Sequence, residues 1–196
     1  KVLKKYLDEY DGAELLSALD KAYSKFEGDP APLVKIDDGI YILELWHGPT
    51  CAFKDMALTV LPYLLRKGCD ICGIKEQVLI LVATSGDTGK AALEGFKDAE
   101  GIKIMVFYPD DGVSKMQKLQ MCTQEGGNVN VVAVKGNFDD CQTAVKRIFS
   151  SEEYAKTLKE KNVILSSANS INFGRLAPQI AYYFSSYLDL VSGGQI

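Results

Sequence analysis

Two short segments hold residue types that could bind an anion or attack a carbonyl group. The first, VATSGDTGKAALEGF at residues 82–96, has the pattern of a strand, a glycine-rich turn and a helix. A nucleotide-binding loop would need glycine at position 84 and a hydroxyl residue at position 91, where this chain has Thr84 and Ala91. We therefore expect the amides of the turn to bind another anion, a carboxylate or a phosphate. Simple capping of the helix by Ser85 or Asp87 is the alternative.

The second segment, ELWHGPTCAFKDMAL at residues 44–58, places one lysine among mostly apolar neighbours. Lys54 follows a Gly-Pro turn and an apolar run at residues 40–46 that predicts a buried strand. Burial lowers the pKa of a lysine because water no longer solvates the ammonium, and a neutral amine can form a Schiff base. The alternative is an ordinary helical lysine with its charge in water.

The elements that must position these residues follow from the apolar pattern. Residues 12–26 have helical spacing behind a cap at Asp11, and residues 53–67 predict a helix that Pro62 kinks or divides. Strands are then expected at residues 77–83, 102–109, 129–136 and 162–168. They alternate with helices at residues 88–98, at 114–125 behind a capping box, at 139–161 with a break near Ser150, and at 171–191. This alternation predicts an α/β fold of βαβ units on a parallel sheet.

Composition and charge exclude several classes of function. The 196 residues carry a net charge of −4, which argues against nucleic acid or acidic membranes as partners. No apolar run approaches the roughly 18 residues of a membrane helix, and no secretory signal is visible. Five scattered cysteines suit a reducing compartment, so a cytoplasmic location is expected. Cys69 and Cys72 lack histidines at zinc-ligand spacing, so no metal site is expected.

Four stretches together resemble one enzyme family. HGPTCAFKD, ATSGDTGKAALEGF, FYPDDGVSKMQKLQM and LSSANSINFGRLAPQIAYYF are similar, in this order and at this separation, to threonine synthases, which use pyridoxal 5′-phosphate. The resemblance runs along essentially the whole chain. It implies a carbon–oxygen lyase of the fold-type-II pyridoxal-phosphate class, with a helical N-terminal segment. Relatives such as cysteine synthases and threonine dehydratases usually have asparagine in place of Asp87.

The resemblance implies a role for each matching residue near the cofactor. Lys54 would hold the cofactor as a Schiff base and then serve as the general base. Phe53 and the turn of Ser85, Gly86 and Asp87 would face the cofactor. An acid at Asp87 near the phenolic oxygen must share a proton with it, because two anions would repel each other.

The resemblance also implies O-phospho-L-homoserine as the substrate. The reaction would remove its γ-phosphate and add water at the β-carbon to yield threonine. An arginine fork with amide and hydroxyl donors suits a phosphate dianion. The implied substrate-binding set is Thr84, Ser85, Thr88, Asn169, Ser170, Asn172 and Arg175. Without the resemblance, helix capping by residues 169–172 and a surface ion pair at Arg175 would be the ordinary interpretation.

Four segments are expected from the resemblance: a helical N-terminal segment at residues 1–45, the cofactor-lysine segment of the large domain at 46–77, a smaller α/β domain at 78–168, and a helix returning toward the large domain at 169–196. The family's Gly-Asn-Phe-Gly phosphate loop is expected farther downstream. The similar Gly136-Asn137-Phe138 is followed by Asp139 and Asp140, which would repel a phosphate.

We therefore expect an internal fragment of the enzyme that by itself binds the cofactor weakly and turns over little or not at all. The sequence leaves the oligomeric state undetermined. Two alternative functions stay open: another pyridoxal-phosphate lyase of the same fold, such as a threonine or serine dehydratase, and a non-catalytic anion-binding fragment.

Overall fold

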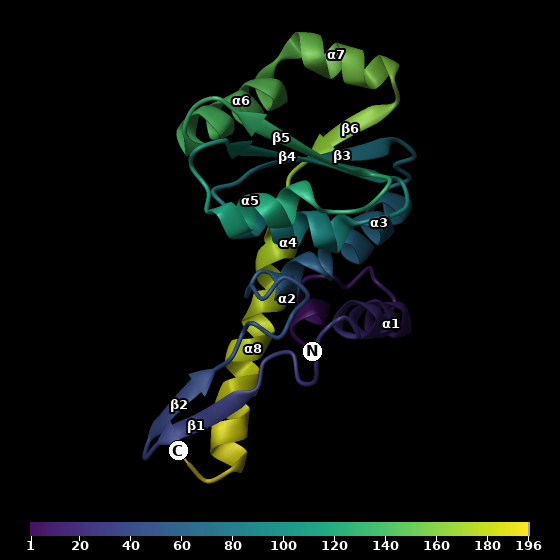
Figure 1. The fold of residues 1–196 in the computed structure, drawn as a ribbon. Helices are drawn as coiled ribbons and strands as arrows, with labels where there is room; N and C mark the ends of the chain where they lie inside the picture. Colours follow the sequence, from purple (N-terminus) through teal and green to yellow (C-terminus); the bar gives the residue numbers. More distant parts are fainter. Residues whose placement is uncertain (196) are drawn as a thin grey trace.

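The computed structural model describes residues 1–195 and places a parallel sheet between two layers of helices (Figure 1). The sheet has the order β5-β4-β3-β6, and every neighbouring pair is parallel. Its strands are β3 (Gln77–Ala83), β4 (Ile102–Pro109), β5 (Val129–Val134) and β6 (Val163–Ser166). The predicted α/β fold of βαβ units is confirmed.

Strand β3 shows why the central strands are continuous apolar runs. Its side chains alternate between two cores, with Ile80 and Val82 packed toward α4 and Leu81 and Ala83 packed toward α6. Because helices cover both faces of a parallel sheet, neither set of side chains can be polar. The limits predicted for β3 and β4 are confirmed to the residue.

One helical layer contains α3 (Leu61–Ile71), α4 (Asp87–Phe96) and α5 (Lys115–Cys122), and the other contains α6 (Phe138–Ser150) and α7 (Glu152–Glu160) (Figure 1). The short helix α2 (Asp55–Leu58) packs directly on α4. Gly95 makes this approach possible, because a Cβ there would overlap the carbonyl oxygen of Leu58. The segment before the sheet is thereby held against α4, the helix that follows the glycine-rich turn.

The remaining elements form an arm beside the sheet domain. They are the 3-10 helix η1 (Leu3–Lys5), α1 (Gly12–Tyr23), the antiparallel hairpin of β1 (Leu33–Asp37) and β2 (Ile40–Leu43), and the long helix α8 (Phe173–Ser192). Figure 1 shows the hairpin beside the distal half of α8. The hydroxyl of Tyr41 donates to Oε1 of Gln195, which ties the hairpin to the end of that helix.

Several predicted boundaries need correction. The strand expected at residues 40–46 ends at Leu43 and is not buried, because it belongs to a two-stranded hairpin; Ile40 is 52% exposed. Its partner β1 was not predicted, so the segment 1–45 contains a hairpin as well as helices. The helix expected at residues 12–26 ends at Tyr23.

Other predicted features are confirmed. The helix expected at residues 53–67 is divided into α2 and α3, and Pro62 lies in the first turn of α3, where its missing N–H costs nothing. Both halves of the capping box between Ser114 and Gln117 are present. The break near Ser150 separates α6 from α7.

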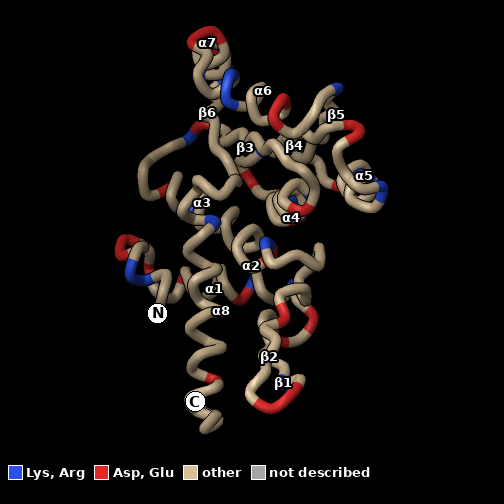
Figure 2. The backbone as a smooth tube through the Cα atoms, turned by 90° about the vertical axis from the view of Figure 1, so that its left-hand side faces the viewer, with Lys and Arg blue, Asp and Glu red and all other residues tan. Residues whose placement is uncertain are grey.

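Helix α8 is nearly free of charge, in contrast to the other helices (Figure 2). Helix α8 has only two charged residues, Arg175 near its start and Asp189 near its end. Its exposed side chains include the aromatic Tyr183, Phe184 and Tyr187. Within residues 1–195, no helix is long and apolar enough to span a bilayer.

Candidate functional site

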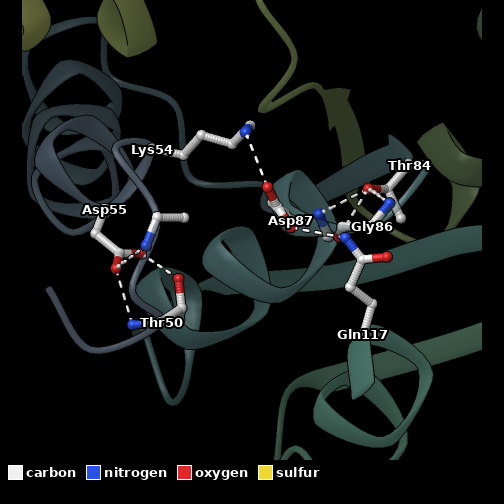
Figure 3. A network of polar contacts seen from close by, with 9 residues as sticks. Thr50, Lys54, Asp55, Thr84, Gly86, Asp87 and Gln117 are labelled. Carbon is white, nitrogen blue, oxygen red and sulfur yellow. Dashed lines mark hydrogen bonds and ion pairs between the residues drawn. The ribbon is translucent and has the colours of Figure 1, made fainter. Parts of the chain in front are cut away.

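The side chain of Lys54 lies against the glycine-rich turn, which it reaches from the start of α2 (Figure 3). Its Nζ is 3.7 Å from Oδ2 of Asp87 and 4.2 Å from the centroid of the Phe53 ring. The side chain is only 15% exposed. The fold therefore brings together the two segments that the sequence singled out, and Lys54 is not an ordinary surface lysine.

Asp55 anchors the turn that precedes Lys54, a function that the sequence analysis did not assign. It is 1% exposed, and its carboxylate accepts from the amide of Thr50 at 2.8 Å, from the Thr50 hydroxyl at 2.6 Å and from the amide of Ala52 at 3.5 Å. Gly48 closes the turn, since a Cβ there would lie 2.6 Å from the Asp55 side chain. Burial raises the pKa of Asp55, and the bonds from Thr50 and Ala52 act in the opposite direction.

The glycine-rich turn is organised by Thr84. Its buried hydroxyl oxygen accepts from the amide of Gly86 at 3.0 Å and from that of Gly89 at 2.9 Å. Gly86 is the N-cap residue of α4 and has φ of +149°. Because glycine has no side chain, the helix has no side-chain cap. Capping by Ser85 or Asp87, the alternative drawn from sequence, is therefore not what the structure shows.

Three backbone amides of the turn are available as donors to an anion. In the part of the chain that the structure describes, residues 1–195, the N–H groups of Ser85, Asp87 and Thr88 have no hydrogen-bond acceptor. They lie at the positive end of α4, where free N–H groups and the helix dipole both favour negative charge. The turn thus has the donors that the sequence predicted, although Gly86 and Gly89 use theirs internally.

A cavity of about 530 Å³ opens beside this turn at the carboxyl edge of the sheet. Ser85 and Thr88 line one side, and the residues of the loop before α8 line the other. Six of the predicted substrate-binding residues share it: Thr84, Ser85, Thr88, Asn169, Ser170 and Arg175. Lys54, Asp87 and Asn172 do not line it. Helix α6 supplies a wall that sequence reasoning missed, including Gln142 and Lys146.

Arg175 is the most buried charged group of this cavity, with 6% of its surface exposed. Its Nη1 makes a long 3.5 Å contact with the carbonyl of Ala168, and its Nε has no hydrogen-bond partner. Burial lowers the pKa of Arg175. No carboxylate within residues 1–195 pairs with it, so the surface ion pair considered from sequence is wrong.

For Asn172 the structure shows helix capping, which is the ordinary interpretation without the family resemblance. Its Oδ1 accepts from the amide of Gly174 at 2.9 Å and its Nδ2 donates to the carbonyl of Ser167 at 2.7 Å. The side chain is thus the N-cap of α8. Likewise Asn137, in the segment that resembles a phosphate loop, caps α6 through a reciprocal pair of bonds with Asp140. The side chains of Asn172 and Asn137 thus already have hydrogen-bond partners within the protein.

Comparison with known proteins agrees with this arrangement. The family model for pyridoxal-phosphate dependent enzymes matches residues 26–184. Threonine synthase-like 1 of Homo sapiens is 45% identical over 176 residues, which are 85% of this chain and 23% of that protein. Threonine synthase of Pseudomonas aeruginosa is 41% identical over 179 residues, 91% of this chain and 37% of that protein.

A solved structure is also similar along nearly the whole chain. The crystal structure of threonine synthase from Brucella melitensis with bound pyridoxal phosphate superposes with a TM-score of 0.81 at 40% identity, covering 91% of this chain and 37% of that one. The chain therefore spans about a quarter to two fifths of the length of these relatives. Its fold is that of the fold-type-II enzymes.

Proposed function

The chain belongs to the family of pyridoxal-phosphate dependent enzymes, and we propose that the protein to which it belongs is a threonine synthase. It would convert O-phospho-L-homoserine and water to L-threonine and phosphate. The observation that carries this proposal is the approach of Lys54 to Asp87 next to a cavity that contains a buried, partly unpartnered arginine. Because the chain covers only part of its relatives, the activity belongs to the whole protein. A cytoplasmic location is part of the same proposal.

The residues of the site fit pyridoxal phosphate. This cofactor has an aldehyde, an acidic phenol and a phosphate, and the chain presents a largely buried amine, a carboxylate and a turn with free amides. Lys54 would hold the cofactor covalently, while Phe53, Ser85, Gly86 and Asp87 would surround it. When bound, the cofactor supplies an electron sink that makes the protons on the neighbouring substrate carbons acidic.

Each residue of this chain then has a definite task. The Nζ of Lys54 would take the proton from the α-carbon of the substrate as a general base. Asp87 would share a proton with the acidic phenol of the cofactor. The loss and gain of protons would thus be confined to two groups 3.7 Å apart.

The substrate phosphate would bind at the cavity. Arg175 has a buried guanidinium with a free N–H, which is worth more to a dianion in a desolvated place than at the surface. Thr84, Ser85, Thr88, Asn169 and Ser170 add hydroxyl and amide groups around it. Asn172 would contribute indirectly, since its side chain caps the helix that positions Arg175. This cationic wall favours a phosphorylated substrate over the uncharged side chains of dehydratase substrates.

The test uses the full-length protein with added pyridoxal phosphate. Borohydride reduction followed by peptide mass spectrometry should place a cofactor adduct on Lys54, and Lys54→Ala should lose both the adduct and about 10³-fold of threonine formation. Lys90→Ala is the matched control, because Lys90 follows the same turn but pairs with Glu94. An absent adduct at Lys54, or release of a keto acid from threonine without turnover of phosphohomoserine, would contradict the proposal.

A further inference from the structure

Gln117, in the first turn of α5, connects two parts of the molecule that meet at the candidate site (Figure 3). Its Nε2 donates to Oδ1 of Asp87 at 2.8 Å. Its Oε1 accepts from the amide of Ser114 at 3.1 Å, within the capping box. Since Oε1 must face the Ser114 N–H, the amide orientation is determined, and only the NH₂ end can face Asp87.

The glycine-rich turn is shaped to receive this side chain. Gly86 has φ of +149° and lies directly under the Gln117 amide, so that a Cβ at position 86 would overlap it. Such backbone geometry favours glycine. Glycine at position 86 and glutamine at position 117 are therefore complementary, and the contact is more than a chance meeting of two surface side chains.

The two oxygens of the Asp87 carboxylate thus have different partners. Oδ1 is used by Gln117, and Oδ2 lies 3.7 Å from Nζ of Lys54. The oxygen of a carboxyl group that carries no proton is a stronger acceptor for an amide N–H than the one that carries the proton. The bond from Gln117 therefore favours Oδ2, the oxygen on the lysine side, as the position of any proton that Asp87 shares.

We propose that Gln117 is a positioning residue of the site, which reserves Oδ1 of Asp87 and directs the proton-holding oxygen toward Lys54. The inference rests on the proposed function in taking Lys54 as the cofactor amine. It adds a contribution from α5, a helix on which the sequence analysis placed no functional residue. The Asp87 side chain is 54% exposed, so the bond to Gln117 adds little to stability, and its main effect is on geometry.

The same pair of helices contains a second bridge of the same kind, which serves as an internal control. Gln124, seven residues after Gln117, donates to Oε2 of Glu94 at 2.9 Å, and Glu94 is seven residues after Asp87. Glu94 also has a lysine partner, Lys90, at 3.8 Å. This second bridge joins α4 to the end of α5 but does not involve Lys54. It shows what such a bridge contributes to folding alone.

The experiment compares Gln117→Met with Gln124→Met in the full-length protein, with pyridoxal phosphate as the ligand. Methionine keeps the length of glutamine and removes both the Nε2 donor to Asp87 and the Oε1 acceptor of the capping box. We expect Gln117→Met to shift the absorption maximum of the lysine-bound cofactor and to slow cofactor uptake by about tenfold, the effect of one hydrogen bond to a charged group. Gln124→Met should leave both unchanged, and the melting temperatures of the two variants should agree.

Exchanging the donor and the acceptor between positions 117 and 87 separates an effect on positioning from an effect on packing. In the double variant Gln117→Glu with Asp87→Asn, the asparagine amide can donate to the new carboxylate, so the bridge is kept and the melting temperature should equal the wild-type value. The spectrum should stay altered, because an amide cannot hold the proton. Wild-type spectra in Gln117→Met or in the double variant would overturn the inference. An absent Lys54 adduct in the unmodified protein would instead overturn the proposed function, so the two failures are distinguishable.

Discussion

Lys54 and Arg175 are two basic residues at helix starts near the same sheet edge, and the surroundings that the fold provides for them are opposite in kind. Lys54 has a carboxylate oxygen at 3.7 Å and an aromatic ring beside it. Arg175 is more deeply buried, and within residues 1–195 no carboxylate pairs with it and its Nε has no partner. The first residue thus has a carboxylate oxygen beside it, and the second has a donor with no partner in the part of the chain that the structure describes.

This difference matches the roles that we propose for the two groups. An amine that is to react has to lose its charge, so a neighbour that exchanges protons with it is useful. A guanidinium keeps its charge and binds an anion best when its donors are not already used by the protein. The cost is a buried cation without an ion pair, which lowers stability. The two turns that carry these residues should therefore respond differently to substitution.

The largest effect on stability is expected at the Lys54 turn. Asp55→Ala leaves the amides of Thr50 and Ala52 and the Thr50 hydroxyl without their acceptor, which should lower the free energy of unfolding by about 3 kcal/mol. Urea unfolding measures this, and the exposed Asp38→Ala is the control. A loss below about 1 kcal/mol would show that the turn does not depend on its anchor.

The Arg175 turn should lose less, because its anchor makes two bonds. Asn172→Ala removes the cap on Gly174 and the bond to Ser167, and we expect a loss of about 1–2 kcal/mol in the free energy of unfolding. Asn172→Asp keeps the acceptor for Gly174 and removes only the donor, so its loss should be smaller. If the two variants were equally destabilised, the cap would not be the stabilising contact.

The smallest change, and one of opposite sign, is expected for Arg175 itself. Arg175→Met replaces a buried cation that has no carboxylate partner by an apolar side chain, and we expect a gain of about 1 kcal/mol in the free energy of unfolding. The same variant should lose the thermal stabilisation that inorganic phosphate gives to the full-length protein. Arg147→Met, at the exposed end of α6, should keep that response. If inorganic phosphate still stabilised Arg175→Met, Arg175 would not be part of the anion site.

The strands and helix starts could be predicted because their signals are local. The limits of β3 and β4 follow from apolar runs bounded by turns, and the capping box of Ser114 and Gln117 is visible as a pattern of four residues. The hairpin of β1 and β2 could not be found in this way. The apolar run of β2 was visible, but it predicted a buried strand, whereas both strands are largely exposed. The partner strand β1 was not predicted, and Tyr41 bonds to Gln195, 154 residues away.

The features of the candidate site fall into the same two groups: those with a local signal in the sequence, and those set by contacts between distant residues. Lys54, the glycine-rich turn and the segment around Arg175 were chosen from residue types and a family resemblance, and the approach of Lys54 to Asp87 agrees with that choice. The two oxygens of Asp87, by contrast, are assigned to Lys54 and Gln117 only by the packing of α2 and α5 on either side of the turn. Asn172 was chosen as a ligand, and its side chain proved to be a cap.

By itself, then, the sequence determined the alternation of strands and helices and the caps, because periodicity and short-range hydrogen bonds act between neighbours in the chain. It also singled out Lys54 as the candidate amine, through residue types and a family resemblance. Only the tertiary structure decided which of these groups is buried, which donor is left free and which carboxylate oxygen faces the lysine. Burial and direction of a side chain depend on elements that are distant in sequence. The contact of Gln117 with Asp87, 30 residues apart, is set by the packing of α5 on α4 and by the missing side chain of Gly86.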